Sequence, residues 1–378
     1  STRKESSAAS DVYKRQHESI LHLPTLLSQI AERVTISVEP YTLRFRRPAK
    51  TSRGEYETKR VYYLRLQSLE QAAHVGYGEC APMPQLSCDD LPDYQAVLEQ
   101  LAGQLAQAPD QFDVVSLRPY PSIAFGLATA INSFLAACHR GEAETTPPFC
   151  DTPFTRGEMG IPINGLIWMG DKAYMYEQIQ AKLAQGFRCL KLKIGGIDFS
   201  EELELLRYVR QHFSPEEMEL RVDANGAFAP EVALERLKRL SDFYLHSIEQ
   251  PIPASNQWDD LAKLTAASPL PIALDEELIG IHTRERKAQL LDEGKPHYII
   301  LKPSLHSGVD EWIELAEERG IGWWATSALE SNVGLSAIAQ WVSQYPIARP
   351  QGLGTGALYL NNKPSTLRLV GDQMFFRD

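Results

Sequence analysis

The sequence predicts an α/β fold whose main part is a closed parallel barrel, preceded by a smaller α+β domain. From about residue 151, short apolar segments with strand composition alternate with segments of helical periodicity. This alternation is typical of βαβ units and therefore of a parallel sheet. Eight candidate strands within about 190 residues suit a closed barrel better than an open sheet. An open doubly wound sheet is the alternative, but the Gly195-Gly196 pair lacks the third glycine of its usual phosphate loop.

The elements of the barrel follow one another at regular intervals. The candidate strands are residues 161–164, 189–194, 220–224, 245–249, 271–275, 298–302, 321–326 and, more weakly, 347–351. Helical patterns lie between them, for example at residues 171–185, 201–211, 231–240 and 309–319. This order predicts that each strand is followed by one helix.

Residues 31–150 have a different pattern, with short strands in series followed by two helices. The strands are expected at residues 34–38, 41–45 and 61–66, and the helices near 89–105 and 122–138. This pattern predicts a small α+β domain, and the Thr- and Pro-rich segment 145–153 is typical of a linker. Residues 1–30 have weak periodicity and are expected to precede the folded part as a disordered extension.

Composition excludes several classes of protein. The formal net charge of -11 over 378 residues argues against nucleic-acid binding, which needs a basic surface. No apolar run approaches the roughly 20 residues of a membrane helix, and the polar N-terminal residues lack the apolar centre of a secretion signal. The 5 cysteines are scattered, without a C-x-x-C pair, as expected for thiols of a cytoplasmic protein. No pattern sets an oligomeric state.

Charged residues stand at the ends of five consecutive candidate strands. They are Lys191 and Lys193 on the second strand, Asp223 on the third, Glu249 on the fourth, Asp275 on the fifth and Lys302 on the sixth. From Lys193 onward they are 26 to 30 residues apart, close to one βα unit each. A single charged strand end is usually only solvated. Five charged strand ends that recur once per βα unit are expected at the C-terminal mouth of a barrel, where active sites form.

The order of these charges predicts a metal-assisted proton abstraction. Lys191 and Lys193 share one strand face by their i, i+2 spacing, and two inward ammonium groups need anions nearby. Three carboxylates on neighbouring strands are suitable ligands for Mg²⁺, with Mn²⁺ as a substitute, whereas no histidine pair has zinc-ligand spacing. A cation and a second ammonium lower the pKa of a lysine from about 10.4, so that it removes a proton beside a carboxylate. The expected substrate is a small carboxylate.

Five motifs resemble the enolase superfamily, in its muconate-lactonizing-enzyme subgroup. They are L-K-L-K-I-G, R-V-D-A-N-G-A, S-I-E-Q-P, I-A-L-D-E and I-L-K-P-S-L-H-S-G. Within the subgroup, T-S-A-L-E-S-N-V-G and Q-G-L-G-T-G are most similar to the o-succinylbenzoate synthase family of menaquinone biosynthesis. The resemblance implies a (β/α)7β TIM-like barrel over residues 151–357 and an N-terminal α+β capping domain over residues 31–150. It also implies that residues 358–378 return to the cap.

The resemblance further implies a role for each charged residue. Asp223, Glu249 and Asp275 would hold the metal. Lys193 would be the base in a syn dehydration and, once protonated, would help hydroxide to leave. Lys302 would stabilise the enediolate from the opposite face. Lys191 would contact the substrate carboxylate and lower the pKa of its neighbour.

Other residues would support the site or select the substrate. Asn225 and Glu276 would lie next to the metal ligands, and Arg221, which shares the face of Asp223, is expected to brace the carboxylates. The candidates for substrate binding are Gly76 in the cap loop 76–84, Ser327 and Glu330 for a succinyl carboxylate, and Asn332 as a helper. The alternative for Gly76 is an ordinary turn, and for Asn332 it is a helix cap.

Related reactions use the same two lysines and remain alternatives. N-succinylamino acid racemization and dipeptide epimerization both need them. Gly352-Leu-Gly354 stands where the epimerases carry D-x-D, which argues against a cationic substrate. Muconate cycloisomerization is disfavoured by the residues of the last two strands, which differ from those of the cycloisomerases. Mandelate racemization is disfavoured because Lys302 stands in place of a histidine. A catalytically dead binding barrel is the alternative from another class, and it would be expected to lose some of these charges.

Overall fold

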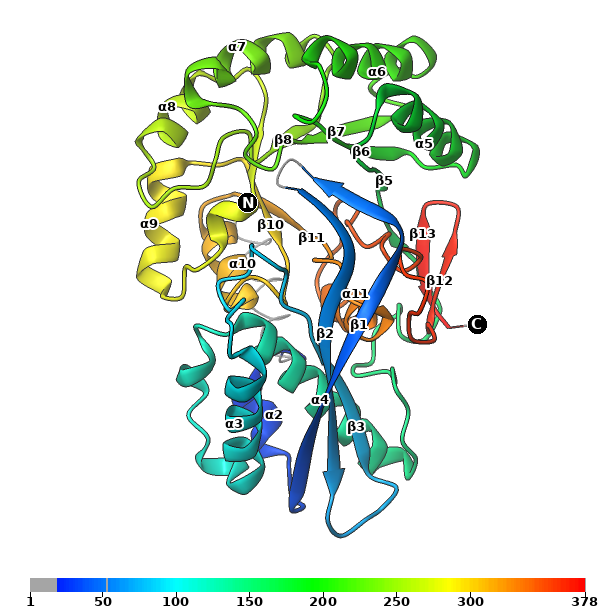
Figure 1. Ribbon diagram of the computed structural model, residues 1–378, viewed down its shortest axis with the longest axis vertical. Helices are drawn as coiled ribbons and strands as arrows, with labels where there is room; N and C mark the ends of the chain where they lie inside the picture. The colour runs from blue at the N-terminus through cyan, green and yellow to red at the C-terminus, as the bar shows by residue number, and fades with distance from the viewer. Residues whose placement is uncertain (1–18, 52–53, 378) are drawn as a thin grey trace, which may run out of the picture.

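A computed structural model describes residues 19–51 and 54–377 of the chain. Figure 1 shows a curled parallel sheet with its helices in the upper part and an antiparallel sheet with its own helices, the cap, in the lower part. The parallel sheet has the order β11-β10-β9-β8-β7-β6-β5, so every strand lies beside its neighbour in the sequence. Its strands are β5 (Gly165–Ile167), β6 (Cys189–Lys193), β7 (Glu219–Asp223), β8 (Ser247–Glu249), β9 (Ile272–Leu274), β10 (Tyr298–Leu301) and β11 (Gly322–Ala325).

The parallel sheet closes through a single short segment at residues 351–352. The amide of Gly352 donates to the carbonyl of Ala325 at 2.8 Å, and Ser327 N donates to Gly352 O at 3.0 Å. On the other side, Asn164 N donates to Gln351 O at 3.0 Å. These parallel bridges join the end of β11 to the residues before β5. The expected eighth strand is therefore present only as this bridge, and the predicted TIM-like barrel is confirmed.

Seven helices follow the barrel strands in turn. They are α5 (Lys172–Ala184), α6 (Phe199–His212), α7 (Pro230–Ser241), α8 (Asp259–Ala267), α9 (Arg284–Gly294), α10 (Val309–Glu318) and α11 (Asn332–Val342). Apolar residues of the strands, such as Leu190, Leu192 and Val222, pack with these helices in one continuous core. The side chains of alternate strand residues are thereby left to point into the barrel.

The cap sheet has the order β1 (Val34–Thr51), β2 (Gly54–Ser68) and β3 (Val75–Cys80). Tyr62, Leu64 and Leu66 of β2 pack in a core with α2 (Leu23–Ser28), α3 (Tyr94–Gln107) and α4 (Pro121–Arg140). The alternate residues Val61 and Tyr63 belong to a separate core that includes barrel residues. One face of the cap sheet thus holds its own helices, and the other covers the barrel.

Helix α4 corrects one expectation from the sequence. Its 20 residues are long and apolar enough to cross a membrane, although no such run was expected. In this structure 78% of its apolar window is buried, and residues such as Ile123, Leu127 and Ile131 pack in the cap core. The core helix of a globular domain has the same composition, because it is apolar on most of its faces.

Four segments differ from the expected boundaries. Residues 34–38 and 41–45 form one strand, since Pro40 lies in β1 at the edge of the sheet, where a missing amide is tolerated. The expected strand 161–164 divides into β4 (Ile161–Pro162), which pairs antiparallel with β13 (Gln373–Phe376), and the barrel strand β5. Residues 1–18 lie outside the described part, but α2 shows that the end of the expected extension is folded.

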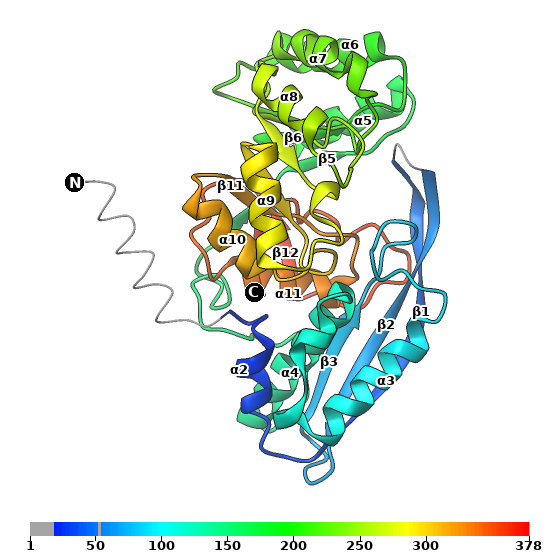
Figure 2. The same cartoon turned by 90° about the vertical axis from the view of Figure 1, so that its left-hand side faces the viewer.

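The C-terminal segment contacts both parts of the molecule. Leu360 N donates to Arg44 O at 2.8 Å, and Arg46 N donates to Leu358 O at 2.8 Å, so residues 358–360 lie along β1 of the cap. Further on, β12 (Leu367–Val370) and β13 form a small sheet with β4, at the start of the barrel. Figure 2 gives the second view of this arrangement.

Candidate active site

The strand register brings the predicted charges to one end of the barrel. Lys193 is the direct partner of Asp223 across β6 and β7, and Asp223 is the direct partner of Glu249 across β7 and β8. Asp275 and Lys302 immediately follow β9 and β10. These five residues therefore stand at the carboxyl ends of five adjacent strands. Because β6 and β10 are the second and sixth positions of an eight-position ring, Lys193 and Lys302 approach from opposite sides.

Two lysines on β6 form ion pairs with the first two carboxylates. Lys191 Nζ lies 2.5 Å from Glu249 Oε2 and 3.0 Å from Asp223 Oδ2. Lys193 Nζ lies 2.6 Å from Asp223 Oδ2 and donates to Asn225 Oδ1 at 2.9 Å. All of these side chains are buried. The carboxylates supply the compensation that two buried ammonium groups require.

Lys302 forms the corresponding pair on the far side, with Asp275. His306 supports it: its Nδ1 accepts from Lys302 N at 3.2 Å, and its Nε2 lies 3.6 Å from Asp275 Oδ1. Burial lowers the pKa of His306 to about 3, against the attraction of Asp275. A neutral imidazole with its proton on Nε2 fits both contacts. The motif I-L-K-P-S-L-H-S-G contains this histidine, but nothing in its spacing predicted the contact.

Burial and the opposed charges shift the pKa values of the cluster. Burial and the charge of Asp223 raise the pKa of Glu249 to about 8. The pKa of Asp223 is lowered, because attraction by Lys191 and Lys193 outweighs the effect of burial. The pKa of Lys302 is raised despite burial, chiefly by Asp275. Shifts of this kind gather where proton transfer takes place.

The three carboxylates fit a divalent cation. Glu249 Oε1 and Asp275 Oδ1 are buried and have no hydrogen-bond partner among the described residues. A buried carboxylate oxygen left in this way is costly, and a hard cation that takes oxygen ligands would relieve the cost. The third carboxylate, Asp223, stands beside Glu249 at the same level of the barrel. The donor set is therefore oxygen only, without cysteine or histidine.

Asn225 and Glu276 lie next to these carboxylates, as expected. Asn225 N donates to Asp223 Oδ1 at 3.0 Å, and its Nδ2 donates to Glu276 Oε1 at 2.9 Å. Gln250 has a similar supporting place that the sequence did not predict. Its Oε1 accepts from the amides of Asp275 and Glu277, each at 3.2 Å. The loops after β7, β8 and β9 are thus tied to one another.

Arg221 was expected to brace the carboxylates, but its contacts lie elsewhere. Its Nε donates to Glu219 Oε1 at 2.6 Å, its Nη1 donates to Pro350 O at 2.9 Å, and its guanidinium lies 4.2 Å from the ring centre of Trp324. The i, i+2 spacing placed it on the inward face correctly, but one layer farther from the mouth than Asp223. Arg221 therefore fills the barrel interior.

A cavity of about 700 Å³, including its part open to solvent, lies over the charged residues. Lys191, Lys193, Asn225 and Lys302 line one part of it. The rest is mostly apolar and comes from both domains: Met83 and Leu86 of the cap, and Leu166, Trp168, Leu305, Ala328 and Leu329 of the barrel. Such a cavity suits a small molecule with an apolar body and a charged end.

Three polar side chains of the cavity were missed by sequence reasoning. Asn164 Oδ1, Thr326 Oγ1 and Thr355 Oγ1 are buried and have no hydrogen-bond partner among the described residues. They lie beside the first and the last strands of the barrel, between which the sheet closes. Their only sequence signal is their place at the ends of the first, seventh and eighth strands. They offer a second polar region for a substrate.

The residues predicted to bind substrate divide into two groups. Ser327 lines the cavity, but its hydroxyl donates to Glu330 Oε2 at 2.5 Å. Glu330 is itself buried outside the cavity lining and also accepts from Ser304. Asn332 binds the C-terminal segment, its N donating to Asn362 Oδ1 at 2.9 Å, and Ser331 has the capping role at α11. Neither Glu330 nor Asn332 is placed to contact a ligand directly.

Gly76 lies inside β3, where it serves packing. A Cβ atom there would lie 2.2 Å from the carbonyl oxygen of Ala130 in α4, so the strand and helix can approach only because the residue is glycine. The cap residues that reach the cavity are Met83 and Leu86, in the irregular segment that follows β3. Gly76, a candidate for substrate binding, is therefore not among the residues that line the cavity.

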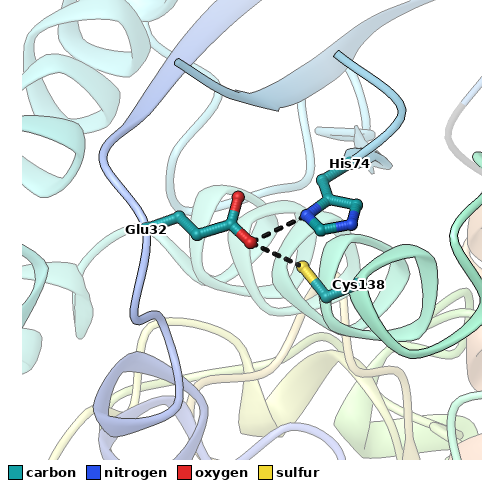
Figure 3. Close-up of side chains that lie close together, drawn as sticks. All are labelled: Glu32, His74 and Cys138. Atoms are coloured by element: carbon teal, nitrogen blue, oxygen red, sulfur yellow. Dashed lines mark hydrogen bonds and ion pairs between the residues drawn. The ribbon is translucent and has the colours of Figure 1, made fainter. Parts of the chain in front are cut away.

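A second cluster of possible metal ligands lies in the cap (Figure 3). The β2–β3 turn, which contributes to it, is at the end of the cap remote from the barrel (Figure 1). Glu32 Oε1 lies 2.7 Å from His74 Nδ1 and 3.9 Å from Cys138 Sγ. These contacts join the segment before β1, the β2–β3 turn and the end of α4. Both contacts use Oε1 of Glu32, which is thereby taken up by groups of the cap itself. The cluster fastens the cap and is separate from the barrel carboxylates.

Comparisons with known proteins agree with this geometry. Residues 174–372 match the family model described as Enolase C-terminal domain-like, and residues 52–134 match MenC, N-terminal domain. An o-succinylbenzoate synthase of Desulfotalea psychrophila is 48% identical over 364 residues, which cover 86% of this chain and 95% of the relative. An N-succinylamino acid racemase of Thermus thermophilus is 38% identical over 163 residues, covering 41% of this chain and 40% of the relative.

Solved structures give the same assignment. The crystal structure of MenC from Desulfotalea psychrophila has a TM-score of 0.75 and 44% identity, covering 91% of this chain and 100% of that one. The muconate lactonizing enzyme from Pseudomonas putida, at 18% identity and a TM-score of 0.70, shares the fold over 91% of this chain and 94% of its own. The chain therefore belongs to the enolase superfamily and, within it, to the o-succinylbenzoate synthase family.

Proposed function

We propose that this protein is a Mg²⁺-dependent o-succinylbenzoate synthase, a lyase that dehydrates 2-succinyl-6-hydroxy-2,4-cyclohexadiene-1-carboxylate. The observation that carries the proposal is the pair of buried lysines, Lys193 and Lys302, which line the cavity from β6 and β10 and are each paired with a buried carboxylate. The family relationship over most of the chain supports this particular reaction.

Asp223, Glu249 and Asp275 would hold the Mg²⁺ ion. Their donor set consists of oxygens, which this cation prefers. When bound, the cation lowers the energy of the negative charge that develops on the substrate carboxylate. Lys191 lies beside the same carboxylates and lines the cavity, so it is placed to bind the carboxylate of the ring.

Lys193 and Lys302 divide the proton transfer and the charge stabilisation. Neutral Lys193 removes the proton from the ring carbon that bears the carboxylate, and the electron pair is delocalised into the carboxylate as an enediolate. The ammonium of Lys302 stabilises this charge from the other face. The pair of electrons then returns to form the ring double bond as hydroxide leaves from the neighbouring carbon. Protonated Lys193 gives its proton to that hydroxide, which leaves as water.

The rest of the cavity fits the remainder of the substrate. Leu166, Trp168 and Leu305 supply apolar surface for the ring and the succinyl chain. The hydroxyls of Thr326 and Thr355 are available to the distal carboxylate, because neither has another hydrogen-bond partner in the described part of the chain. A site built to bond a carboxylate discriminates strongly against an analogue without it.

The test is a dehydration assay on the purified protein, followed by ultraviolet absorbance. We expect o-succinylbenzoate to form from the cyclohexadiene substrate, the rate to vanish with a chelator, and Mg²⁺ to restore it. Mn²⁺ should substitute in part. Absence of dehydration under these conditions would reject the proposal.

N-succinylamino acid racemization is the second candidate, and the partial similarity to the Thermus thermophilus racemase favours it over other reactions. It needs the same two lysines on opposite faces of a carbon acid. Deuterium exchange at the α-carbon of an N-succinyl amino acid, measured by NMR, separates the two candidates. Racemization without dehydration would move the assignment to this reaction.

A further inference from the structure

Lys59 of the cap is buried at the junction with the barrel. It lies on β2, on the same face as Val61 and Tyr63, because alternate residues of a strand point the same way. Its side chain is 1% exposed. The ammonium donates to two barrel carbonyls, to Ala328 O at 2.6 Å and to Leu329 O at 3.1 Å. A cap residue thus binds the backbone of the loop that follows β11.

That loop forms one wall of the cavity. Ser327, Ala328 and Leu329 are consecutive lining residues. Leu329 has a φ of 64°, in the left-handed region that residues other than glycine adopt only at a cost. Its carbonyl also accepts from Tyr359 Oη at 2.6 Å. Within the loop, Leu329 N donates to Ser327 Oγ at 3.0 Å. Groups outside the loop bind its carbonyls, and Lys59 supplies the only charged one among the described hydrogen bonds to the carbonyls of Ala328 and Leu329.

The charges around Lys59 connect it to both ends of the site. Burial lowers the pKa of Lys59, and attraction by Glu330 and Glu79 opposes this. Glu330 accepts from Ser304, two residues after Lys302, and from Ser327 in the cavity wall. Glu79 accepts from the amides of Ser331 and Gly334 at 2.7 and 2.8 Å, at the start of α11. One buried network thus holds the loops after β10 and β11.

A buried charge of this kind is weak evidence for stability, because apolar residues of the same volume often stabilise as well or better. Its place argues for another role. The network contacts the wall of the cavity through the carbonyls of Ala328 and Leu329 and the hydroxyl of Ser327. None of its hydrogen bonds in the described part of the chain goes to the carboxylates of Asp223, Glu249 or Asp275. It is therefore suited to fix the shape of the wall without altering the proton-transfer groups.

We propose that Lys59 is a positioning residue through which the cap fixes the wall 327–329, and thereby sets the affinity for the part of the substrate that lies against this wall. The proposal rests on the proposed function, since it assumes that this cavity binds the substrate. It assigns a task to the cap beyond covering the barrel: a cap residue that never touches substrate determines how well the substrate fits.

The experiment compares Lys59→Met with a matched control, Lys287→Met. Lys287 is also 1% exposed, and its ammonium donates to Gly308 O at 3.1 Å and to Glu311 Oε2 at 2.8 Å, away from the cavity lining. Both variants remove a buried ammonium and keep an unbranched side chain. Steady-state kinetics give KM and kcat, and calorimetric titration with o-succinylbenzoate gives the Kd of the product.

We expect Lys59→Met to raise KM and the product Kd at least about tenfold, equivalent to about 1.4 kcal/mol, with kcat changed by less than about threefold. The affinity for Mg²⁺ should stay the same. Lys287→Met should lower the melting temperature about as much as Lys59→Met does, and it should leave KM unchanged. Unchanged KM and Kd in Lys59→Met, or a loss confined to kcat, would overturn the proposal.

A second variant covers the case in which Lys59→Met does not fold. Tyr359→Phe removes the other side-chain hydrogen bond to Leu329 O without changing a buried charge. It should raise KM in the same direction but by less, and an unchanged KM would refute positioning of this wall by outside groups. Failure of the wild-type protein to dehydrate its substrate would reject the proposed function itself. An active wild type with an unaffected Lys59→Met variant would reject only the role of Lys59.

Discussion

Replacement of Lys193 by alanine should stop dehydration and leave the fold in place. The side chain is the base and then the acid of the proposed reaction, so its loss affects both proton transfers. The structure gives a reason why the protein should tolerate the change. Asp223, the partner of Lys193, keeps a second ammonium, because Lys191 Nζ lies 3.0 Å from the same oxygen. The remaining carboxylate charge is therefore still compensated.

The loss of stability and the loss of activity in Lys193→Ala differ in size. Removal of one member of a buried ion pair costs about 3–5 kcal/mol when the other charge is left alone. The cost here should be well below that range, since Asp223 remains paired. A positioned acid or base contributes about 10²–10⁴-fold to a rate. Because Lys193 acts in both steps, we expect kcat to fall by at least about 10⁴-fold, equivalent to about 5 kcal/mol of lost transition-state stabilisation.

The assay is the absorbance change of the cyclohexadiene substrate at saturating Mg²⁺, with melting temperatures measured in parallel. Lys193→Arg is the matched control, because it keeps a positive charge but cannot lose its proton near neutral pH. It should be as inactive as the alanine variant. A kcat within tenfold of the wild type in either folded variant would refute the assignment of Lys193 as the base.

Three further predictions concern the metal, the second lysine and pH. Asp223→Asn should raise the Kd for Mg²⁺ at least about tenfold by calorimetric titration, and an unchanged Kd would remove Asp223 from the ligand set. Lys302→Met should lower the melting temperature of chelator-treated protein more than Lys193→Ala does, since among the described residues the only other ion-pair partner of Asp275 is His306, at 3.6 Å; equal losses would contradict this. Burial raises the pKa of Glu202 from 4.5 to about 6. The contribution of Glu202 to the free energy of unfolding is therefore full below pH 4.5, and about 2 kcal/mol of it is lost as the pH rises through about 6. Glu202→Gln should abolish this part of the pH dependence of unfolding.

The charged residues of the site were predictable because a strand has a strict period. The i, i+2 spacing of Lys191 and Lys193, and the recurrence of one charge per βα unit, determine which face and which end of the barrel each occupies. The structure places these residues together. The same period did not distinguish between layers, and for this reason Arg221 was expected beside the carboxylates although it lies deeper in the barrel.

The cavity wall was less predictable, because it depends on contacts between segments far apart in the sequence. Glu330 and Asn332 follow the seventh strand, where substrate-binding residues are often found, but their side chains bind Ser304 and the C-terminal segment, Asn332 Nδ2 donating to Lys363 O at 2.6 Å. Lys59 has no local signal either. Its strand β2 begins at Gly54, several residues before the apolar pattern that predicted it.

Glycines and the closing strand show two other limits of local pattern. Gly76 was expected in a substrate-binding cap loop, but it lies inside β3, where the close approach of α4 decides its identity. The same approach of helix to strand occurs at Gly78, whose Cβ would meet Gly126 O. The last barrel strand is reduced to the bridge at residues 351–352, since closure needs only the hydrogen bonds that fill the gap between β11 and β5. A segment this short has too few residues to show a period.

The central claim is that a divalent cation binds between Asp223, Glu249 and Asp275, with Lys193 and Lys302 facing each other across the bound molecule. The most direct measurement is the anomalous diffraction of crystals grown with Mn²⁺ and o-succinylbenzoate. We predict one strong anomalous peak within coordination distance of all three carboxylates, and product between the two Nζ atoms. A peak elsewhere, or product with both lysines on one face, would contradict the mechanism.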